Sequence, residues 1–185
     1  MYHIKNDKRA QASSELICAG LLACMKEKPF ARITITDVQH ASTVSRSTFY
    51  RNFDCLEDVL ALLCDRGFQA VFTAYNALPP AQRGNLPKAV FHYWFHNSAV
   101  LEALVQIHRT DILFDSLRRS SGLIEALQPL ADDPARFDYF VAIITSAMIG
   151  VLTVWVEHGK TETEDQMVQK LTSAFIEMAI LELPG

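Results

Sequence analysis

The sequence predicts an all-α protein of about nine helices. Apolar residues recur every three or four positions along most of its 185 residues, which is the spacing of amphipathic helices. Serine, threonine, aspartate or asparagine precedes several of these segments, and proline or glycine follows them, as expected for helix N-caps and helix ends. No segment shows a convincing β-strand pattern.

Three helices are expected in the first 53 residues. The first spans residues 8 to 28, and a proline ends it. Thr34 and Asp37 form a capping box that opens a second, short helix, and Ser45 caps a third. Apolar side chains from all three segments can close a small core, so this part of the chain is expected to fold as a compact module.

A long helix is expected to connect this module to the rest of the chain. Asp54 and Glu57 form a second capping box, and the helical pattern continues to the proline pair that begins at Pro79. At 1.5 Å per residue such a helix spans about 35 Å, so it ties the two parts together mechanically. We therefore expect two domains, residues 1–53 and residues 54–185.

Five more helices are expected in the second domain. The third of them has a possible break near Ser121, and the fourth has Asp133 as its N-cap and Pro134 at its first position. Thr161 with Glu164 predicts a capping box for the last helix. The first four are expected at residues 86–97, 98–108, 111–128 and 134–158, and the last runs from its cap at Thr161 to about residue 183.

The fourth of these helices is apolar nearly all round. One of its sides can pack inside the chain, and a second copy of the chain is the economical cover for the other, which predicts a two-fold homodimer. Complete burial within one chain is the alternative. The expected interface residues are Ala147, Gly150, Val151, Val154, Phe175, Met178 and Ala179.

The charge distribution also separates residues 1–53 from residues 54–185. Eight basic and four acidic side chains in residues 1–53 give this part a charge of +4, although the whole chain carries −4. A basic module attached to an acidic body favours contact with a polyanion. Chance clustering of surface charge is the alternative.

Several classes of function find no support in the sequence. The chain lacks the GxSxG, HExxH, P-loop and GxGxxG motifs, so neither an enzyme nor a cofactor is expected. The four cysteines lack CxxC spacing and lie in apolar surroundings, which favours buried, reduced thiols. Polar residues interrupt the longest apolar stretch, which falls short of the roughly 20 residues of a membrane span. A cytoplasmic protein with no membrane contact is expected.

The segment VSRSTFYRNF, residues 44–53, carries the strongest functional signal. Its apolar residues would face inward, and its outward face carries hydrogen-bond donors without a carboxylate, which suits the DNA major groove. Arg46 can bond a guanine edge, and Thr48 can meet a thymine methyl group or a phosphate. A solvated polar helix face is the alternative. The expected DNA-binding residues are Thr34, Thr36, Ser45, Arg46, Ser47, Thr48, Tyr50, Arg51 and Asn52.

The run from Ile33 to Phe53, followed by a helix with an acidic start, resembles the DNA-binding domain of the TetR (tetracycline repressor) family. The similarity covers about residues 8–65 and includes a recognition-helix pattern like V-S-x-x-T-[FL]-Y-x-x-F. The resemblance implies an N-terminal helix-turn-helix and a helical C-terminal domain that dimerises and binds a small-molecule inducer. By position, it also implies a phosphate contact for Thr34 and DNA contacts for Ser45, Arg46, Thr48, Tyr50 and Arg51.

Two positions depart from the family pattern. Ser42-Thr43 stands where Ala-Gly is usual, so a residue with a side chain takes a left-handed position that glycine normally fills. Leu56 stands where a lysine often touches phosphate. Non-specific affinity would therefore depend more on the basic N-terminal arm, which carries Lys5, Lys8 and Arg9.

The sequence therefore predicts a ligand-responsive transcriptional repressor that binds a palindromic double-stranded DNA operator as a homodimer and is released by a small-molecule inducer. The alternative, suggested by Thr43 and Leu56, is a TetR-like protein-interaction module that has lost sequence-specific DNA binding.

Aromatic and histidine residues of the middle helices are the candidates for the inducer pocket, although core packing is the alternative for each of them. His92 and His96 share a helical face, but the sequence shows no carboxylate or cysteine companion, so no metal site is assigned. The expected ligand-binding residues are Phe72, Tyr75, His92, Phe95, His96, His108 and Phe114.

Overall fold

The computed structural model describes residues 2–125, 127 and 132–181, and within these ranges the protein is entirely helical. The predicted all-α class is confirmed, with nine α-helices in the described part of the chain. Their bounds are α1 (Lys8–Glu27), α2 (Ile35–Ser42), α3 (Arg46–Asn52), α4 (Leu56–Ala77), α5 (Leu86–His96), α6 (Ser98–Gln106), α7 (Asp111–Ser120), α8 (Pro134–Glu157) and α9 (Glu164–Leu181).

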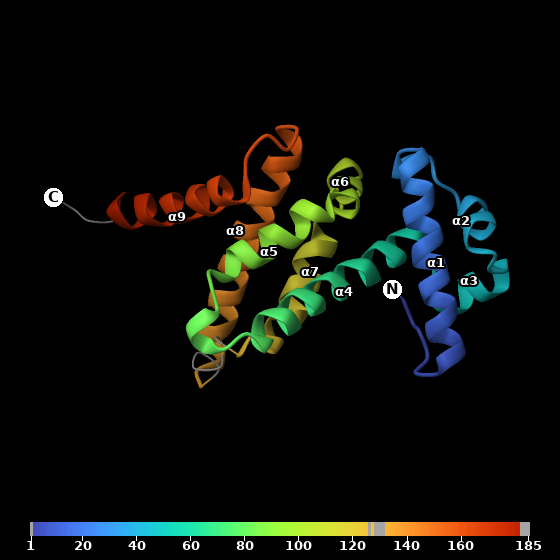
Figure 1. Cartoon of the computed structure of the whole chain (residues 1–185), viewed down its shortest axis with the longest axis horizontal. Helices are drawn as coiled ribbons and strands as arrows, with labels where there is room; N and C mark the ends of the chain where they lie inside the picture. The colour runs from blue at the N-terminus through green and yellow to red at the C-terminus, as the bar shows by residue number, and fades with distance from the viewer. Residues whose placement is uncertain (1, 126, 128–131, 182–185) are drawn as a thin grey trace.

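Helices α1, α2 and α3 form one end of the molecule (Figure 1). α1 contacts both α2 and α3, and the three helices close a small core that includes Ile17, Leu21, Val38 and Phe49. At the α1–α2 contact, a Cβ atom on Gly20 would lie 2.8 Å from Ser42 Cβ. Only glycine therefore lets the two helices approach this closely.

Local hydrogen bonds fix the start of α2 and the turn that joins it to α3. The predicted capping box is present: the Asp37 N–H donates to Thr34 Oγ1, and the Thr34 N–H donates to Asp37 Oδ2. Thr43 has φ 57° and ψ 16°, so a β-branched residue does occupy the left-handed position. Ser42 Oγ accepts the Val44 N–H at 3.3 Å, which holds the turn against the start of α3.

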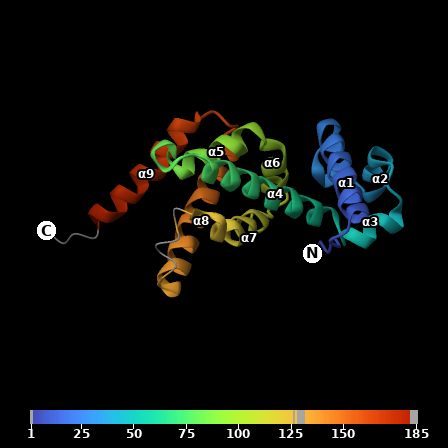
Figure 2. The ribbon, with the colours of Figure 1, turned by 60° about the horizontal axis from the view of Figure 1, so that its bottom comes forward.

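α4 is the connecting helix, and it contacts α1 as well as α5, α6 and α7 (Figure 2). Its 22 residues span about 33 Å, close to the predicted length. The predicted capping box of Asp54 and Glu57 was wrong. The helix begins at Leu56, and the Asp54 N–H donates to Asp58 Oδ2 at 2.9 Å, one position later than expected.

Polar contacts also tie the N-terminal segment and α1 to the rest of the chain. Arg66 of α4 forms an ion pair with Glu15 of α1 at 2.9 Å. The hydroxyl group of Tyr2 donates to Asp65, whose carboxylate also binds Arg119 of α7 at 2.8 Å. Burial and the bond to Asp65 raise the pKa of Tyr2 to about 12, so its hydroxyl keeps the donated proton.

The four cysteines are free thiols, as expected. Cys18, Cys24 and Cys64 are buried, and Cys55 is half-buried. Burial raises the pKa of Cys18 to about 11, which disfavours the reactive thiolate.

Helices α5 to α8 surround the second half of α4, and α9 projects away from them (Figures 1 and 2). The break predicted near Ser121 is confirmed, because α7 ends and a 3-10 turn, Ser121–Leu123, follows. The capping box predicted for the last helix was wrong, since Thr163 and Gln166 form it and Thr161 and Glu164 do not. The predicted end of this helix near residue 183 lies outside the described residues.

α8 has two apolar faces, of which one is covered. Val141, Leu152 and Trp155 are buried against the helical body, whereas Ile143 is 57% and Val154 is 45% exposed. The alternative of complete burial within one chain is therefore wrong for the described structure.

α8 is also long and apolar enough, by length and composition alone, to cross a membrane, so the expectation that this segment falls short was wrong. In the described structure, one face of α8 packs against the helical body.

Candidate DNA-binding surface and effector sites

α3 presents a polar, exposed face. Phe49 is fully buried, and Thr48 is half-buried. Ser45 caps the helix, because its Oγ accepts the Thr48 N–H at 3.3 Å. The helix contains no acidic residue, so its face offers hydrogen-bond donors and positive charge. The exposed side chains on this face are Ser45, Arg46, Ser47, Tyr50 and Arg51.

Two arginines of α3 are oriented by side chains one turn away. The guanidinium carbon of Arg46 lies 5.6 Å from the centroid of the Tyr50 ring, within the range of a cation–π contact. Arg51 Nη2 lies 3.5 Å from Thr48 Oγ1. A guanidinium group has several N–H donors, so both arginines keep donors for base edges and phosphates.

Asn52 was predicted to face DNA, and this prediction was wrong. Its side chain is 2% exposed, and its Nδ2 donates to the Thr48 carbonyl oxygen at 2.8 Å. The backbone carbonyl oxygen of Asn52 accepts the His3 N–H at 3.0 Å. Asn52 therefore joins the N-terminal arm to the end of α3 and does not belong to the polar face.

The basic N-terminal arm lies beside α3. Lys5 and Arg9 line a small cleft together with Thr48 and Arg51. Both residues are exposed, as is Lys8, and the structure places Lys8 and Arg9 in the first turn of α1. The arm thus extends the positively charged surface of α3.

The start of α2 offers less to a phosphate than expected. The Thr34 N–H and hydroxyl groups both donate to Asp37 at 2.7 Å, so neither group is free for the phosphate contact that the resemblance implies for Thr34. Hydrogen bonds from Lys28 and Thr34 hold the pKa of Asp37 well below its usual range, so its carboxylate stays charged here. Thr36 is exposed, and Leu56, at the lysine position of the family pattern, is buried.

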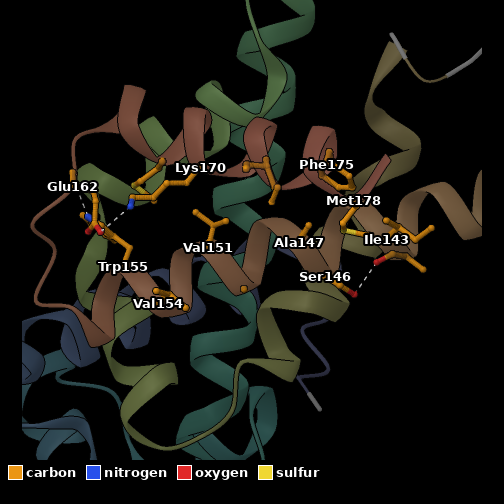
Figure 3. Close-up of a pocket in the computed structure, with 15 residues that line it drawn as sticks. Ile143, Ser146, Ala147, Val151, Val154, Trp155, Glu162, Lys170, Phe175 and Met178 are labelled. Carbon is orange, nitrogen blue, oxygen red and sulfur yellow. Dashed lines mark hydrogen bonds and ion pairs between the residues drawn. The ribbon is translucent and has the colours of Figure 1, made fainter. Parts of the chain in front are cut away.

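An apolar groove of about 770 Å³ runs between α8 and α9 (Figure 3). At one end, Lys170 Nζ lies 3.9 Å from Glu162 Oε1. Ala179 is exposed but does not line the groove. The other six residues predicted for the dimer interface all line it: Ala147, Gly150, Val151, Val154, Phe175 and Met178.

A separate cavity of about 320 Å³ lies inside the helical body, between α4, α5, α7 and α8. Of the residues predicted for the ligand pocket, Phe72 lines it. Three of the others lie outside this cavity: Phe95 stacks on Trp155, His108 is exposed, and Phe114 is half-buried elsewhere. Sequence reasoning missed most of the lining: Leu86, Pro87, Val90, Leu117, Ser121, Ile124, Leu127, Phe140, Val141, Ile144, Thr145 and Met148.

The remaining predicted pocket residues, Tyr75, His92 and His96, line a third hollow, an open groove beside α4, α5 and the start of α9. The Tyr75 hydroxyl donates to the Gly84 carbonyl oxygen at 2.9 Å. Glu164 of α9 reaches the two histidines and provides the carboxylate that the local sequence did not reveal.

Comparisons with known proteins agree with this architecture. Residues 88–177 match a TetR family model described as a transcriptional regulator C-terminal region. Lin0861 from Listeria innocua has a similar fold, with a TM-score of 0.74 and 17% sequence identity over 95% of this chain and 96% of that chain. No curated protein sequence matches the chain.

Two further solved structures have the same fold. A TetR-family transcriptional regulator from Syntrophomonas wolfei has a TM-score of 0.64 and 17% identity, with 94% of this chain and 97% of that chain covered. A TetR transcriptional regulator from Streptococcus agalactiae has a TM-score of 0.56 and 18% identity, with 91% and 96% covered.

The family match covers 90 of the 185 residues, so residues 88–177 are similar to the C-terminal region of TetR-family transcriptional regulators. The solved structures show the same fold along nearly the whole chain. Regulators of this family bind DNA and dimerise in general, and the match to them agrees with the expectation that the protein is not an enzyme.

Proposed function

We propose that this regulator is a repressor that binds a palindromic operator as a homodimer and leaves DNA when a small-molecule inducer binds. The observation that carries the DNA-binding part is the polar face of α3, where Arg46, Tyr50 and Arg51 are exposed on a helix without an acidic residue. In a helix-turn-helix such a face enters the major groove. Residues 1–53 would act as the DNA-binding domain and residues 54–185 as the regulatory domain, in the cytoplasm.

The proposed dimer forms through the groove between α8 and α9. Val154 is 45% and Met178 is 61% exposed on this apolar surface, and soluble monomers rarely expose large contiguous apolar patches. A two-fold axis would place α8 and α9 of the partner subunit on the same surface, because each copy presents an identical patch. Gly150 leaves open space on this surface, since a Cβ atom built on it would meet nothing within 4 Å.

The proposed inducer is a small, mainly apolar molecule that occupies the 320 Å³ cavity. This volume is at the lower end of the range for small-molecule pockets, about 300–1,000 Å³. Ser121 and Thr145 are the hydroxyl-bearing residues of its lining, and they can orient a polar group of the ligand. Phe72 of α4 also lines the cavity, so a ligand that displaces α4 would change the separation of the two α3 helices in the dimer.

Selection of bound fragments from the source genome, followed by gel-shift titration, tests the proposal. We expect a preferred palindromic fragment, bound by two chains, with half-sites about 34–36 Å apart. Added salt should weaken this binding, because phosphate contacts release counterions. Failure to enrich any fragment would refute operator binding.

A protein-interaction module that has lost sequence-specific DNA binding is the second candidate. Two observations favour it: Thr43 holds the turn before α3 in a left-handed conformation, and Leu56 is buried where the family pattern has a lysine. The same selection separates the two candidates. Salt-dependent binding of one preferred fragment excludes the interaction module, and absence of binding to all fragments supports it.

A further inference from the structure

One face of α5 meets the first turn of α9. Lys88, His92 and His96 follow each other at four-residue intervals, so they lie along the same side of α5. Lys88 Nζ lies 2.5 Å from Asp165 Oδ1. His92 Nδ1 lies 3.0 Å from one carboxylate oxygen of Glu164, and His96 Nδ1 lies 3.9 Å from the other.

His92, His96 and Glu164 are spaced like the ligands of a metal ion. Each offers one ligand atom, and these atoms all lie within 4.8 Å of one another. Neighbouring ligands of a tetrahedral zinc ion are about 3.3 Å apart when the bonds are about 2.0 Å. The side chains of His92 and His96 are 63% and 58% exposed, so they are free to close the remaining distance by rotation.

Local contacts prepare the site for a cation. His96 Nδ1 lies 2.9 Å from the carbonyl oxygen of His92. A carbonyl oxygen only accepts, so Nδ1 carries the donated proton and Nε2 keeps its lone pair for a metal. A bond of this kind supports most metal-bound histidines. The neighbouring ammonium group of Lys88 is paired with Asp165, which offsets its repulsion of a metal ion.

We propose that His92, His96 and Glu164 bind a zinc ion, with water completing the coordination, and that the ion joins α5 to the start of α9. Two histidines at i and i+4 with one carboxylate form a recurrent zinc donor set. Glu164 is available because Thr163 and Gln166 form the capping box of α9. The ion would fix the orientation of a helix that also lines the α8–α9 groove.

Calorimetric titration of tag-free, metal-stripped protein with zinc sulfate tests the proposal. We expect one zinc ion per chain, and a loss of at least about tenfold in affinity for His96→Gln and for Glu164→Gln. His158→Gln is the matched control, because His158 is an exposed histidine that lies 3.9 Å from a different carboxylate, Glu162. It should leave the affinity unchanged. Circular dichroism checks that each variant is folded.

The cobalt-loaded protein identifies the ligands by spectroscopy. We expect d–d bands of a four- or five-coordinate ion without a thiolate charge-transfer band, because no cysteine belongs to the cluster. A thiolate band would overturn the proposal. So would absence of zinc binding to the wild-type protein, or unchanged binding in the folded double variant His92→Gln/His96→Gln.

Discussion

Thr43→Gly should stabilise the protein, because it removes an unfavourable backbone conformation from the α2–α3 turn. Thr43 has φ 57° and ψ 16°, and an L-residue pays about 1–2 kcal/mol in this region. The added freedom of glycine in the unfolded chain costs about 0.4–1 kcal/mol. The Thr43 side chain is exposed, so its loss removes little packing. The net gain therefore lies between about 0 and 1.6 kcal/mol, with a central value of about 0.8 kcal/mol.

Thermal unfolding at a fixed chain concentration measures this gain. For a protein of 185 residues, 1 kcal/mol corresponds to about 2–4 °C, so a rise of about 1–4 °C is expected. Thr172→Gly is the control, because Thr172 is exposed within the right-handed helix α9, where glycine should lower the melting temperature. A lower melting temperature for Thr43→Gly would refute the reasoning.

Three further substitutions test the packing and the two effector surfaces. Gly20→Ala should destabilise the protein by about 1–3 kcal/mol in urea unfolding, because the new Cβ would meet Ser42 Cβ at 2.8 Å; unchanged stability would disprove this tight contact. Gly150→Arg should convert the dimer to monomers in sedimentation analysis without unfolding the chain, since its Cβ meets nothing within 4 Å; an intact dimer would argue against the α8–α9 interface. Ile144→Trp should fill the cavity, so operator binding should remain while release by the inducer is lost; continued release would place the inducer elsewhere.

The sequence predicted helices well where the signal is local. The capping box of Thr34 and Asp37 and the cap at Ser45 depend on residues three positions apart, and both are present. The box predicted at Asp54 failed because Asp58, a rival carboxylate four residues on, accepts its N–H. The choice between neighbouring capping residues depends on how the chain enters the helix, which sequence spacing does not determine.

In the candidate sites too, local features were predicted from the sequence, and features that depend on the fold were not. The polar face of α3 follows from helical periodicity, except at Asn52, whose side chain is buried and donates to the Thr48 carbonyl oxygen. The cavity combines residues of four helices far apart in the chain, so aromatic content alone selected Phe72, which lines it, together with Phe95, which does not. Glu164 lies 72 residues after His92, and only the folded chain brings them together.

Operator binding by α3 is the central claim, and affinity measured against salt concentration tests it most directly. Arg46→Ala should cost about 1–3 kcal/mol at the selected operator and relax its specificity, whereas Arg51→Ala should weaken all sequences alike and reduce the salt slope by about 1. Arg118→Ala, at an exposed arginine of α7, should leave both unchanged. Equal operator affinity for the wild-type protein and the two α3 variants would contradict the claim.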